Sequence, residues 1–428
     1  MKRLKSTFKI VLATFLVFFS VQQKAEAKNW NDARLSDSLL QQMDAVDISL
    51  LTCGPGSEVW SLYGHTAIRY QNHDKKTDVA VNYGAFSFEQ DYFVPRFVFG
   101  LTDYCMDIMP MHVFLQEYKR EGRWVVQQDL NLTREEKAAI TYALEQNSLP
   151  ENRDYRYNFF YDNCTTRAKD MIINHLNING YNCDNQWNNE SYRTMIHQWN
   201  EHHRWSRFGN DLLLGIQSDF KTDKEASFFL PDSLRKHFNS IVLTNNDGTV
   251  RKLVSKESYL IDKQKAGATL TIEQFLLTPV TLFGFLFVIV LLASLLQFYT
   301  KGNYWLLDLL LLLASGAAGL ILLAMVFSQH PTVSINLQIL ILNPLSLFFL
   351  YPTIKAERKR QVHVYWKVLF CCVILFFIGS IWQTYAEGIN FLALILLVRS
   401  WMVLKGTRSK EQGARSKEQG VRSKLKNK

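Results

Sequence analysis

The chain has 428 residues, which is enough for two or more domains, and it carries 48 Lys and Arg against 39 Asp and Glu, a formal net charge of +9. Aromatic residues make up 13% of it and charged residues only 20%, a composition that excludes a disordered protein. The excess positive charge lies outside the largest region, because residues 28–278 hold 27 basic and 33 acidic residues. That region lacks the basic surface that nucleic-acid binding requires, so we predict no nucleic-acid partner.

The first 27 residues have the three parts of a secretory signal peptide. A basic start, MKRLKSTFK, precedes an apolar stretch over 10–21, and the small-residue motif Ala25-Glu26-Ala27 follows. An apolar stretch of 12 residues is too short to span about 30 Å of hydrocarbon comfortably, which favours cleavage over an uncleaved anchor. We therefore predict a signal peptide over 1–27 and export of the domain that follows, 28–265.

The exported region 28–265 has the pattern of an α+β domain. A capping box at Thr133-Arg-Glu-Glu136 opens a helix to about Asn147. The segment 157–164 is extended and aromatic, and apolar residues at helical spacing after it predict a second helix. The segment 181–265 is polar and rich in Asn and Trp, and it predicts no clear element. The predicted strands are Val46–Cys53, His65–Gln71, Val79–Tyr83 and Arg123–Leu130.

The cysteines and histidines of this region do not indicate a metal site. Its four cysteines are too few for a disulfide framework and show no C-x-x-C spacing, so we expect no zinc and no cofactor, while the pairing of Cys53, Cys105 and Cys183 stays open. The histidines at 197, 202 and 203 lack the i,i+4 spacing of a helical metal pair, and we expect them to be solvated.

Cys164 is the candidate nucleophile. It stands where the extended segment turns into the second helix, and either Asp162 or Asn163 is placed to cap that helix. A thiol in the first turn feels the positive end of the helix dipole, which lowers its pKa. Cys53 is a rival, although it precedes a Gly-Pro-Gly turn rather than a helix. The ordinary alternative is that Cys164 is a small buried apolar residue.

A nucleophilic thiol needs a base, and His65 is the candidate. It follows Gly64, where the chain can approach another segment closely, and it begins a predicted strand. Asn82, near the end of the next strand, is the candidate to hold the imidazole tautomer, while Asp162 and Tyr63 remain alternatives for that role. A purely structural role for the histidine is the competing interpretation.

After a linker over 266–278, the chain becomes apolar and predicts an all-α bundle of five transmembrane helices. We expect Arg399 to reach the membrane surface from a helix end, and Asn343-Pro344 to kink the third helix. The predicted helices cover about 279–299, 304–327, 336–354, 362–386 and 389–404.

The basic loops give the orientation. If the domain after the signal is exported, the loop with Lys301, the cluster over 355–360 and the basic repeats of the tail over 405–428 all fall on the cytoplasmic side. We therefore predict a multi-pass protein of the cell inner membrane, with a periplasmic domain and a cytoplasmic C-terminus. The tail is expected to lie against anionic lipid.

Three segments carry a resemblance to known enzymes: Y-G-H-T-A-I-R at 63–69, V-N-Y-G at 81–84 and Y-N-F-F-Y-D-N-C-T-T-R-A at 157–168. Their order resembles the permuted papain-like (NlpC/P60-related) arrangement, in which the histidine strand precedes the cysteine helix, an order shared by retinol acyltransferase-like enzymes. The whole chain resembles the Bacteroidetes lipoprotein N-acyltransferase family, Lnb. The resemblance implies Cys164 as nucleophile and His65 as base, and it does not decide the role of Asn82.

The resemblance implies a membrane-bound thiol acyltransferase without a cofactor. It would move an acyl chain from a membrane phospholipid, through a Cys164 thioester, to the N-terminal amine of a diacylglyceryl-cysteine lipoprotein. One alternative is a cell-wall peptidase of the NlpC/P60 class, although five membrane helices are more than such an enzyme needs. Another is a non-enzymatic exported binding domain coupled to a membrane anchor. The oligomeric state stays open.

Overall fold

The computed structural model describes residues 37–86, 91–183, 189–263 and 277–405. The predicted signal peptide, all but the last two residues of the predicted linker, and the tail beyond residue 405 lie outside the described residues. Residues 1–42 form a unit of their own, of which the structure describes the short helix α2 (Asp37–Gln42). Everything below concerns the second unit, 43–428.

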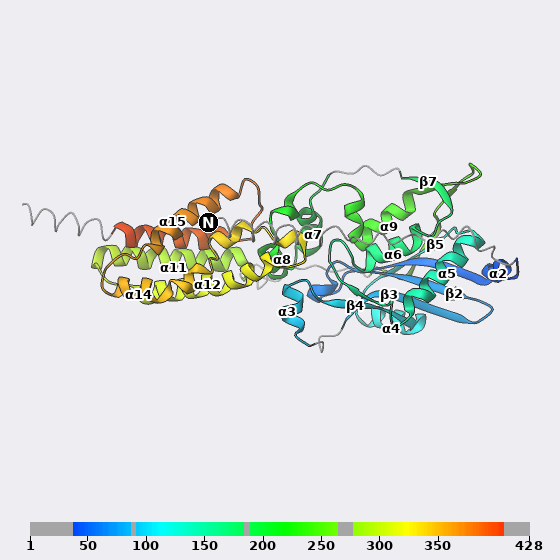
Figure 1. The fold of residues 1–428 in the computed structure, drawn as a ribbon, viewed down its shortest axis with the longest axis horizontal. Coiled ribbons are helices and arrows are strands. Elements are labelled where there is room, and N and C mark those ends of the chain that lie inside the picture. Colours follow the sequence, from blue (N-terminus) through cyan, green and yellow to red (C-terminus); the bar gives the residue numbers. More distant parts are fainter. Residues whose placement is uncertain (1–36, 87–90, 184–188, 264–276, 406–428) are drawn as a thin grey trace, which may run out of the picture. The chain divides into compact units, whose positions relative to one another are not determined.

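A seven-stranded sheet forms the centre of the first half of this unit (Figure 1). All of its neighbouring strands pair antiparallel, in the order β10-β5-β1-β2-β3-β4-β6. A smaller sheet has the order β7-β8-β9. The strands are β1 (Val46–Cys53), β2 (His65–Asn72), β3 (Thr77–Ala85), β4 (Asp103–Pro110), β5 (Val125–Leu130), β6 (Asp154–Arg156), β7 (Ile178–Cys183), β8 (Ile241–Asn245), β9 (Val250–Lys252) and β10 (Val254–Ile261).

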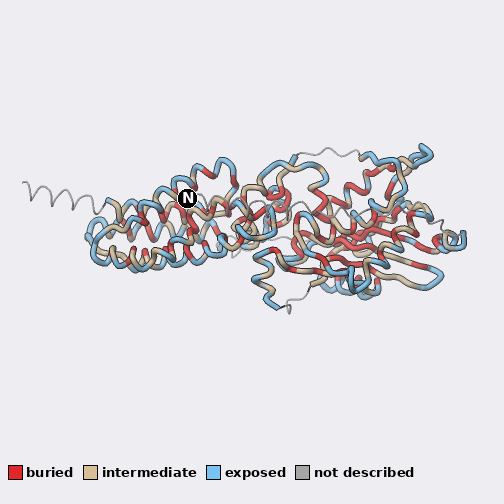
Figure 2. The backbone as a smooth tube through the Cα atoms, in the orientation of Figure 1, coloured by how far each residue is buried: buried red, intermediate tan, exposed pale blue. Residues whose placement is uncertain are grey.

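Helices cover both faces of the large sheet (Figure 1). Helix α4 (Met111–Arg120) packs on one face, where Phe114 meets Leu51 and Ala67. Helices α6 (Cys164–Ile173) and α9 (Pro231–Ser240) pack on the other, and α5 (Arg134–Ser148) lies beside α6. Figure 2 shows the buried positions running along the central strands.

The α+β prediction for this region is confirmed in its main elements. The strands expected at 46–53, 65–71, 79–83 and 123–130 are β1, β2, β3 and β5, with ends that agree within two residues. The capping box of α5 is also confirmed, because Thr133 and Glu136 each accept a hydrogen bond from the other's backbone N–H. The segment 181–265, which the sequence left unassigned, contains the whole of α9, β8, β9 and β10.

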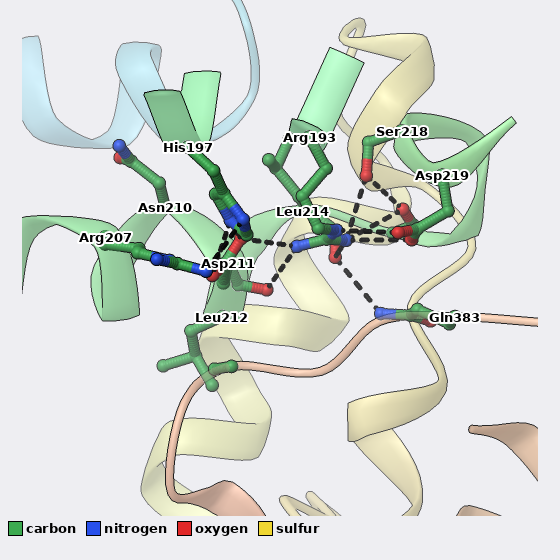
Figure 3. Close-up of polar contacts among 12 residues, drawn as sticks. Arg193, His197, Arg207, Asn210, Asp211, Leu212, Leu214, Ser218, Asp219 and Gln383 are labelled. Carbon is green, nitrogen blue, oxygen red and sulfur yellow. Dashed lines mark hydrogen bonds and ion pairs between the residues drawn. The ribbon is translucent and has the colours of Figure 1, made fainter. Parts of the chain in front are cut away.

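Two helices of that segment contain a buried ionic cluster (Figure 3). Arg193, on α7 (Tyr192–Asn200), is 2% exposed and binds Asp211 of α8 (Arg204–Leu213) at 2.7 Å. It also binds Asp219 of the 3-10 turn η4 (Ile216–Asp219) at 2.9 Å. His197 pairs with Asp211 at 2.8 Å, so the expectation that this histidine is solvated is wrong. We call Arg193, His197, Arg207, Asp211 and Asp219 the Arg193 cluster.

The Arg193 cluster is also where the first half of the unit is bonded to the apolar second half. Amide side chains donate hydrogen bonds to the backbone around α8. Gln338 donates to Asp211 O at 2.9 Å. Gln383 donates to Leu214 O at 3.1 Å (Figure 3). The Gly215 N–H donates to Thr332 O at 2.8 Å. A Cβ at Gly215 would collide with the Ile335 carbonyl, so glycine is required for this close approach.

Two helices of the second half, α11 (Pro279–Thr300) and α12 (Trp305–Val326), are long and apolar enough to cross a membrane, judged over the described residues. The helix α15 (Tyr365–Gly379) is apolar but shorter, and a last helical stretch covers 389–405. The remaining helical pieces described in the unit are α3 (Phe93–Val98), α13 (Leu345–Phe348), α14 (Leu350–Arg358), η2 (Met43–Ala45), η3 (Val59–Ser61), η5 (Glu225–Phe229), η6 (Pro331–Val333) and η7 (Leu337–Leu340).

The prediction of one continuous helix over 336–354 is wrong. This segment is broken into η7, α13 and the start of α14, and it is not a single kinked helix. The break has a local cause, because Pro344 lacks an N–H and the Asn343 side chain accepts the Leu345 N–H at 2.9 Å, as an N-terminal cap does. The helix expected over 362–386 is also shorter than predicted, since α15 ends at Gly379.

Arg399 does not extend out of the helical bundle to solvent, which corrects another expectation. Its side chain is fully buried and forms two hydrogen bonds to Asp308, at 2.7 and 2.6 Å. Ser294 and Gln297 accept further hydrogen bonds from it. A buried charge in an apolar bundle needs such a counterion, and the sequence pattern alone did not pair residues this far apart.

Candidate active site

Strand β2 begins at His65, and the preceding glycine places it. Gly64 has φ +83°, and a Cβ there would lie 2.6 Å from the Cys53 carbonyl oxygen. Only glycine fits this approach, as the sequence predicted. The turn brings His65 directly opposite Cys53 in the β1–β2 register, with its ring at the end of the sheet.

Cys164 is the first residue of α6, and Asn163 fixes that helix end. The Asn163 side-chain oxygen accepts hydrogen bonds from the backbone N–H groups of Thr165 and Thr166, at 2.9 and 3.0 Å. The Thr166 hydroxyl accepts a hydrogen bond from the backbone N–H of Asn163 at 2.9 Å. The Asn163 side-chain nitrogen donates to the carbonyls of Phe159 and Phe229, both at 2.9 Å. Of the two capping candidates the structure selects Asn163, and the network holds the thiol in one place.

His65 and Asn82 are brought together by the β2–β3 pairing. The His65 Nε2 and Asn82 Oδ1 atoms lie 3.1 Å apart, and Asn82 is buried. Because an amide oxygen only accepts, this contact fixes the tautomer with hydrogen on Nε2 and leaves Nδ1 for the thiol.

The two alternatives for the third position are occupied elsewhere. Asp162 binds Arg167 through two hydrogen bonds, at 2.6 and 2.9 Å. The Tyr63 hydroxyl accepts hydrogen bonds from Asn200 and Asn210, at 3.2 and 2.6 Å. Of the three candidates, Asn82 is therefore the one that the structure places on the imidazole.

The thiol and the imidazole stabilise each other as an ion pair. Removal from water raises the pKa of Cys164. The charge of His65 and its hydrogen bond to the thiol lower that pKa by more, and so do hydrogen bonds from the Thr66 backbone and the Thr165 hydroxyl. The net result is a pKa of about 7. Removal from water lowers the pKa of His65, while the Cys164 charge and the hydrogen bonds to Cys164 and Asn82 raise it by more. Such mutual shifts are typical of a reactive thiolate.

Cys53, the rival nucleophile, lies in a different environment. It is fully buried at the end of β1, and burial raises the pKa of its thiol to about 12 despite the nearby charge of Arg123. A thiol with that pKa stays protonated at neutral pH, so Cys53 packs as a small apolar residue.

The Cys164–His65 pair lines a cleft of 540 Å³. Gly84 lies beside the thiol, where a Cβ would make ordinary contact with the Cys164 Cβ at 3.7 Å, and its φ of +89° favours glycine. Sequence reasoning missed Gly84, Thr66 and Thr165 as site residues, although all three lie inside or beside the matched motifs. The aromatic residues that line the cleft are Trp60, Tyr63, Tyr83, Phe86, Tyr104, Phe114, Tyr118, Tyr157, Phe159 and Phe229.

Two protein-family models match the chain: the Lnb N-terminal periplasmic domain over residues 37–197 and the Lnb transmembrane domain over residues 271–411. The chain belongs to the Lnb family. The Lnb assignment confirms the resemblance that the motifs suggested and makes this a membrane protein with a periplasmic domain. No curated protein and no solved structure matches the chain.

The Lnb periplasmic fold extends beyond the matched residues. The match ends at residue 197, inside α7, whereas β10 pairs with β5 at the edge of the large sheet and α9 packs on β1. The described part of this Lnb chain contains no group of three or more His, Cys, Asp or Glu side chains that could hold a metal ion.

Proposed function

We propose that this Lnb protein transfers an acyl chain from a membrane phospholipid to the N-terminal amine of a diacylglyceryl-cysteine lipoprotein. The observation that carries the proposal is the Cys164–His65–Asn82 arrangement, in which a thiol with a pKa of about 7 faces an aromatic cleft. The order of the histidine strand before the cysteine helix fits a permuted papain-like domain. Family membership supports an acyltransferase, and the transmembrane domain fits lipid substrates.

The first half-reaction acylates the enzyme. His65 takes the proton of Cys164, and the thiolate sulfur attacks the ester carbonyl carbon of the phospholipid. A carbon–sulfur bond forms as the carbon–oxygen bond to glycerol breaks. The His65 imidazolium gives its proton to the departing glycerol oxygen, so a lysophospholipid leaves and the acyl chain remains as a thioester.

The second half-reaction transfers the chain to the acceptor. The neutral α-amine of the lipoprotein attacks the thioester carbonyl, forming a carbon–nitrogen bond as the carbon–sulfur bond breaks. His65, neutral after the first step, accepts the amine proton, and the Cys164–His65 ion pair is restored. The amide product is more stable than the thioester, and the cycle needs no water, oxidant or cofactor.

The start of α6 supplies a donor for the oxyanion of each tetrahedral intermediate. The cap uses the amides of Thr165 and Thr166, which leaves the Cys164 amide as the first-turn donor that the Asn163 side chain does not take. This N–H lies at the positive end of the helix and next to the reacting sulfur. An N–H group at this position stabilises the negative charge that develops on the carbonyl oxygen.

The membrane placement belongs to the same proposal. Basic loops at Lys301 and over 355–360 put the periplasmic domain and the C-terminus on opposite sides of the inner membrane. A donor phospholipid and a diacylated acceptor both lie in that membrane, so a tethered enzyme meets them in two dimensions.

The test is complementation. The protein is expressed in bacteria depleted of their own lipoprotein N-acylating enzyme, and a lipoprotein N-terminal peptide is analysed by mass spectrometry. We expect an added N-acyl mass that disappears in Cys164→Ala, with equal amounts of protein in the membrane. No added mass from a well-expressed wild type would overturn the proposal.

The same cells separate the alternative functions. Muropeptide analysis would show shortened stem peptides if the enzyme were a cell-wall peptidase, again dependent on Cys164. A non-enzymatic binding domain would retain its function in both Cys164→Ala and His65→Ala, which the proposed mechanism forbids.

A further inference from the structure

The helix α3 presents large apolar side chains to the outside of the periplasmic domain. Tyr92, just before its start, is 80% exposed, and Phe97 is 45% exposed. Phe99, just past its end, is also exposed. Contiguous exposed aromatic residues on the surface of a water-soluble domain indicate a binding surface. The position of α3 in the fold indicates what this surface binds.

The residues that follow α3 lie against the chain just after a membrane-crossing helix. The Phe99 carbonyl accepts the Gln329 N–H at 3.0 Å, and Arg156 donates to the Gln329 side chain at 3.3 Å. A Cβ on Gly100 would lie 3.1 Å from the His330 ring. Gln329 and His330 come three and four residues after the end of α12.

The length of α12 sets the depth of these contacts. Its 22 residues rise about 33 Å at 1.5 Å each, close to the thickness of the hydrocarbon core. Gln329 therefore lies at the membrane–water interface, on the side that carries the periplasmic domain. Because Phe99 is bonded to Gln329, α3 lies at the same level, where aromatic side chains are favoured.

A series of ring contacts leads from α3 into the cleft. The centroids of Phe97 and Phe93 are 6.3 Å apart, and those of Phe93 and Phe86 are 6.0 Å apart. Phe86 contacts Tyr104 at 4.9 Å, and Tyr104 contacts Tyr157 at 4.0 Å. We call these five residues the aromatic row.

The inner end of the aromatic row reaches Cys164. Phe86, Tyr104 and Tyr157 line the same cleft as the thiol. The row therefore connects the membrane interface with the reacting atom.

The charged groups beside the row bind one another. Arg96 of α3 and Arg156 of β6 share the carboxylate of Asp103, which leaves one net positive charge on the three side chains. The row itself consists of rings, which fit an apolar chain.

We propose that the aromatic row is the path along which the acyl chain of a phospholipid moves from the periplasmic leaflet to Cys164. This inference rests on the proposed function for its final step, the thioester. The evidence for the path does not depend on that step, because the position of α3 at the membrane interface is the same whatever reaction follows.

The first test is photo-cross-linking of full-length Cys164→Ala in vesicles of phosphatidylethanolamine and phosphatidylglycerol that contain a phospholipid with a diazirine near the acyl terminus. We expect adducts on the peptides that carry Phe93, Phe97 and Tyr104, in addition to those on the membrane helices. Adducts on the membrane helices alone would overturn the proposal. Since this variant cannot form a thioester, the result does not depend on catalysis.

The second test compares Phe97→Ser with Phe220→Ser, a matched control because Phe220 is 56% exposed and lies outside the row. We expect Phe97→Ser to form the Cys164 thioester from vesicle phospholipid about tenfold more slowly, while Cys164 keeps its rate of alkylation by iodoacetamide. The control should match the wild type in both. Equal rates of thioester formation in the two variants would contradict the proposed path. A wild type that forms no thioester would contradict the proposed function, and the cross-linking result would then decide whether the path exists.

Discussion

Two buried polar clusters in this protein each contain a histidine and have different roles. In the Arg193 cluster both ring nitrogens of His197 have permanent partners, with Nε2 on Asp211 at 2.8 Å and Nδ1 accepting from Arg207 at 2.9 Å. At the cleft, His65 uses Nε2 for Asn82 and turns its other nitrogen to a thiol. The first histidine is locked by charge pairs, and the second is paired with a group that reacts.

The comparison shows which buried polar cluster is a candidate for chemistry. The Arg193 cluster matches each charge with a counter-charge, and it lies where Gln338 and Gln383 of the membrane region donate hydrogen bonds to the backbone around α8. The Cys164 site keeps its ion pair beside a cleft of 540 Å³, where a substrate fits. Neither burial nor access to a cavity distinguishes the two, because Arg193, His197 and Asp219 line a pocket of 310 Å³. The difference is that the Cys164 site holds a nucleophilic side chain next to its histidine.

The largest expected effect is that of removing the base. His65→Ala should reduce lipoprotein N-acylation by about 10²- to 10⁴-fold, because the thiol loses both its proton acceptor and its counter-charge. The measurement is the N-acyl mass on a lipoprotein in complemented cells. His197→Ala is the matched control at the other cluster, and activity per folded molecule should be retained there. Equal losses in both variants would contradict the comparison.

The Arg193 cluster should dominate stability instead. Arg193→Met leaves Asp219 without its counter-charge and Asp211 with only His197 and Arg207, which should cost about 3–5 kcal/mol of unfolding free energy. The measurement is the thermal midpoint of the purified protein in detergent. Arg134→Gln is the control, since the Arg134–Asp44 pair is about half exposed and should cost under about 1 kcal/mol. Similar midpoints for the two variants would show that the cluster is not a structural junction.

The pH dependence of Cys164 tests the ion pair. The rate of alkylation by iodoacetamide, followed on the Cys164 peptide by mass spectrometry, should rise with pH through a midpoint of about 7. In His65→Gln the burial that raises the pKa of Cys164 is opposed only by the Thr66 backbone and the Thr165 hydroxyl, so the midpoint should move well above 7. A midpoint that stays near 7 would mean that another group stabilises the thiolate.

The smallest effect is expected for the orienting residue. Asn82→Ala removes one hydrogen bond from His65, which should slow acyl transfer by roughly 2- to 10-fold. Tyr63→Phe and Asp162→Asn change the two alternatives and should have less effect on the Cys164 alkylation profile than Asn82→Ala. The reverse ranking would reassign the third position.

The candidate site could be predicted because its determinants are local. Gly64 before His65, the alternation of β2 and the change from extended chain to helix at Cys164 are all readable within a few residues. The third position could not be decided in the same way. Asn82, Asp162 and Tyr63 are equally plausible in sequence, and only the strand register and the partners of each side chain separate them.

The Arg193 cluster and the membrane region were less predictable because their partners are distant. Arg193 lies 18 residues from Asp211, and Arg399 lies 91 residues from Asp308. The apolar composition of 336–354 satisfied the pattern of a spanning helix, although Asn343 and Pro344 end the hydrogen-bond ladder there. Hydropathy measures transfer to lipid and does not report where a helix is interrupted.

The most direct test of the central claim is a search for the acyl group on Cys164 itself. Purified full-length protein is incubated with phospholipid vesicles in the absence of acceptor, and its peptides are analysed by mass spectrometry. The account predicts a fatty-acyl mass on the Cys164 peptide that is removed by neutral hydroxylamine, lost on adding an acceptor amine and absent in His65→Ala. An acyl mass on another residue, or N-acylated lipoprotein formed by Cys164→Ala, would contradict it.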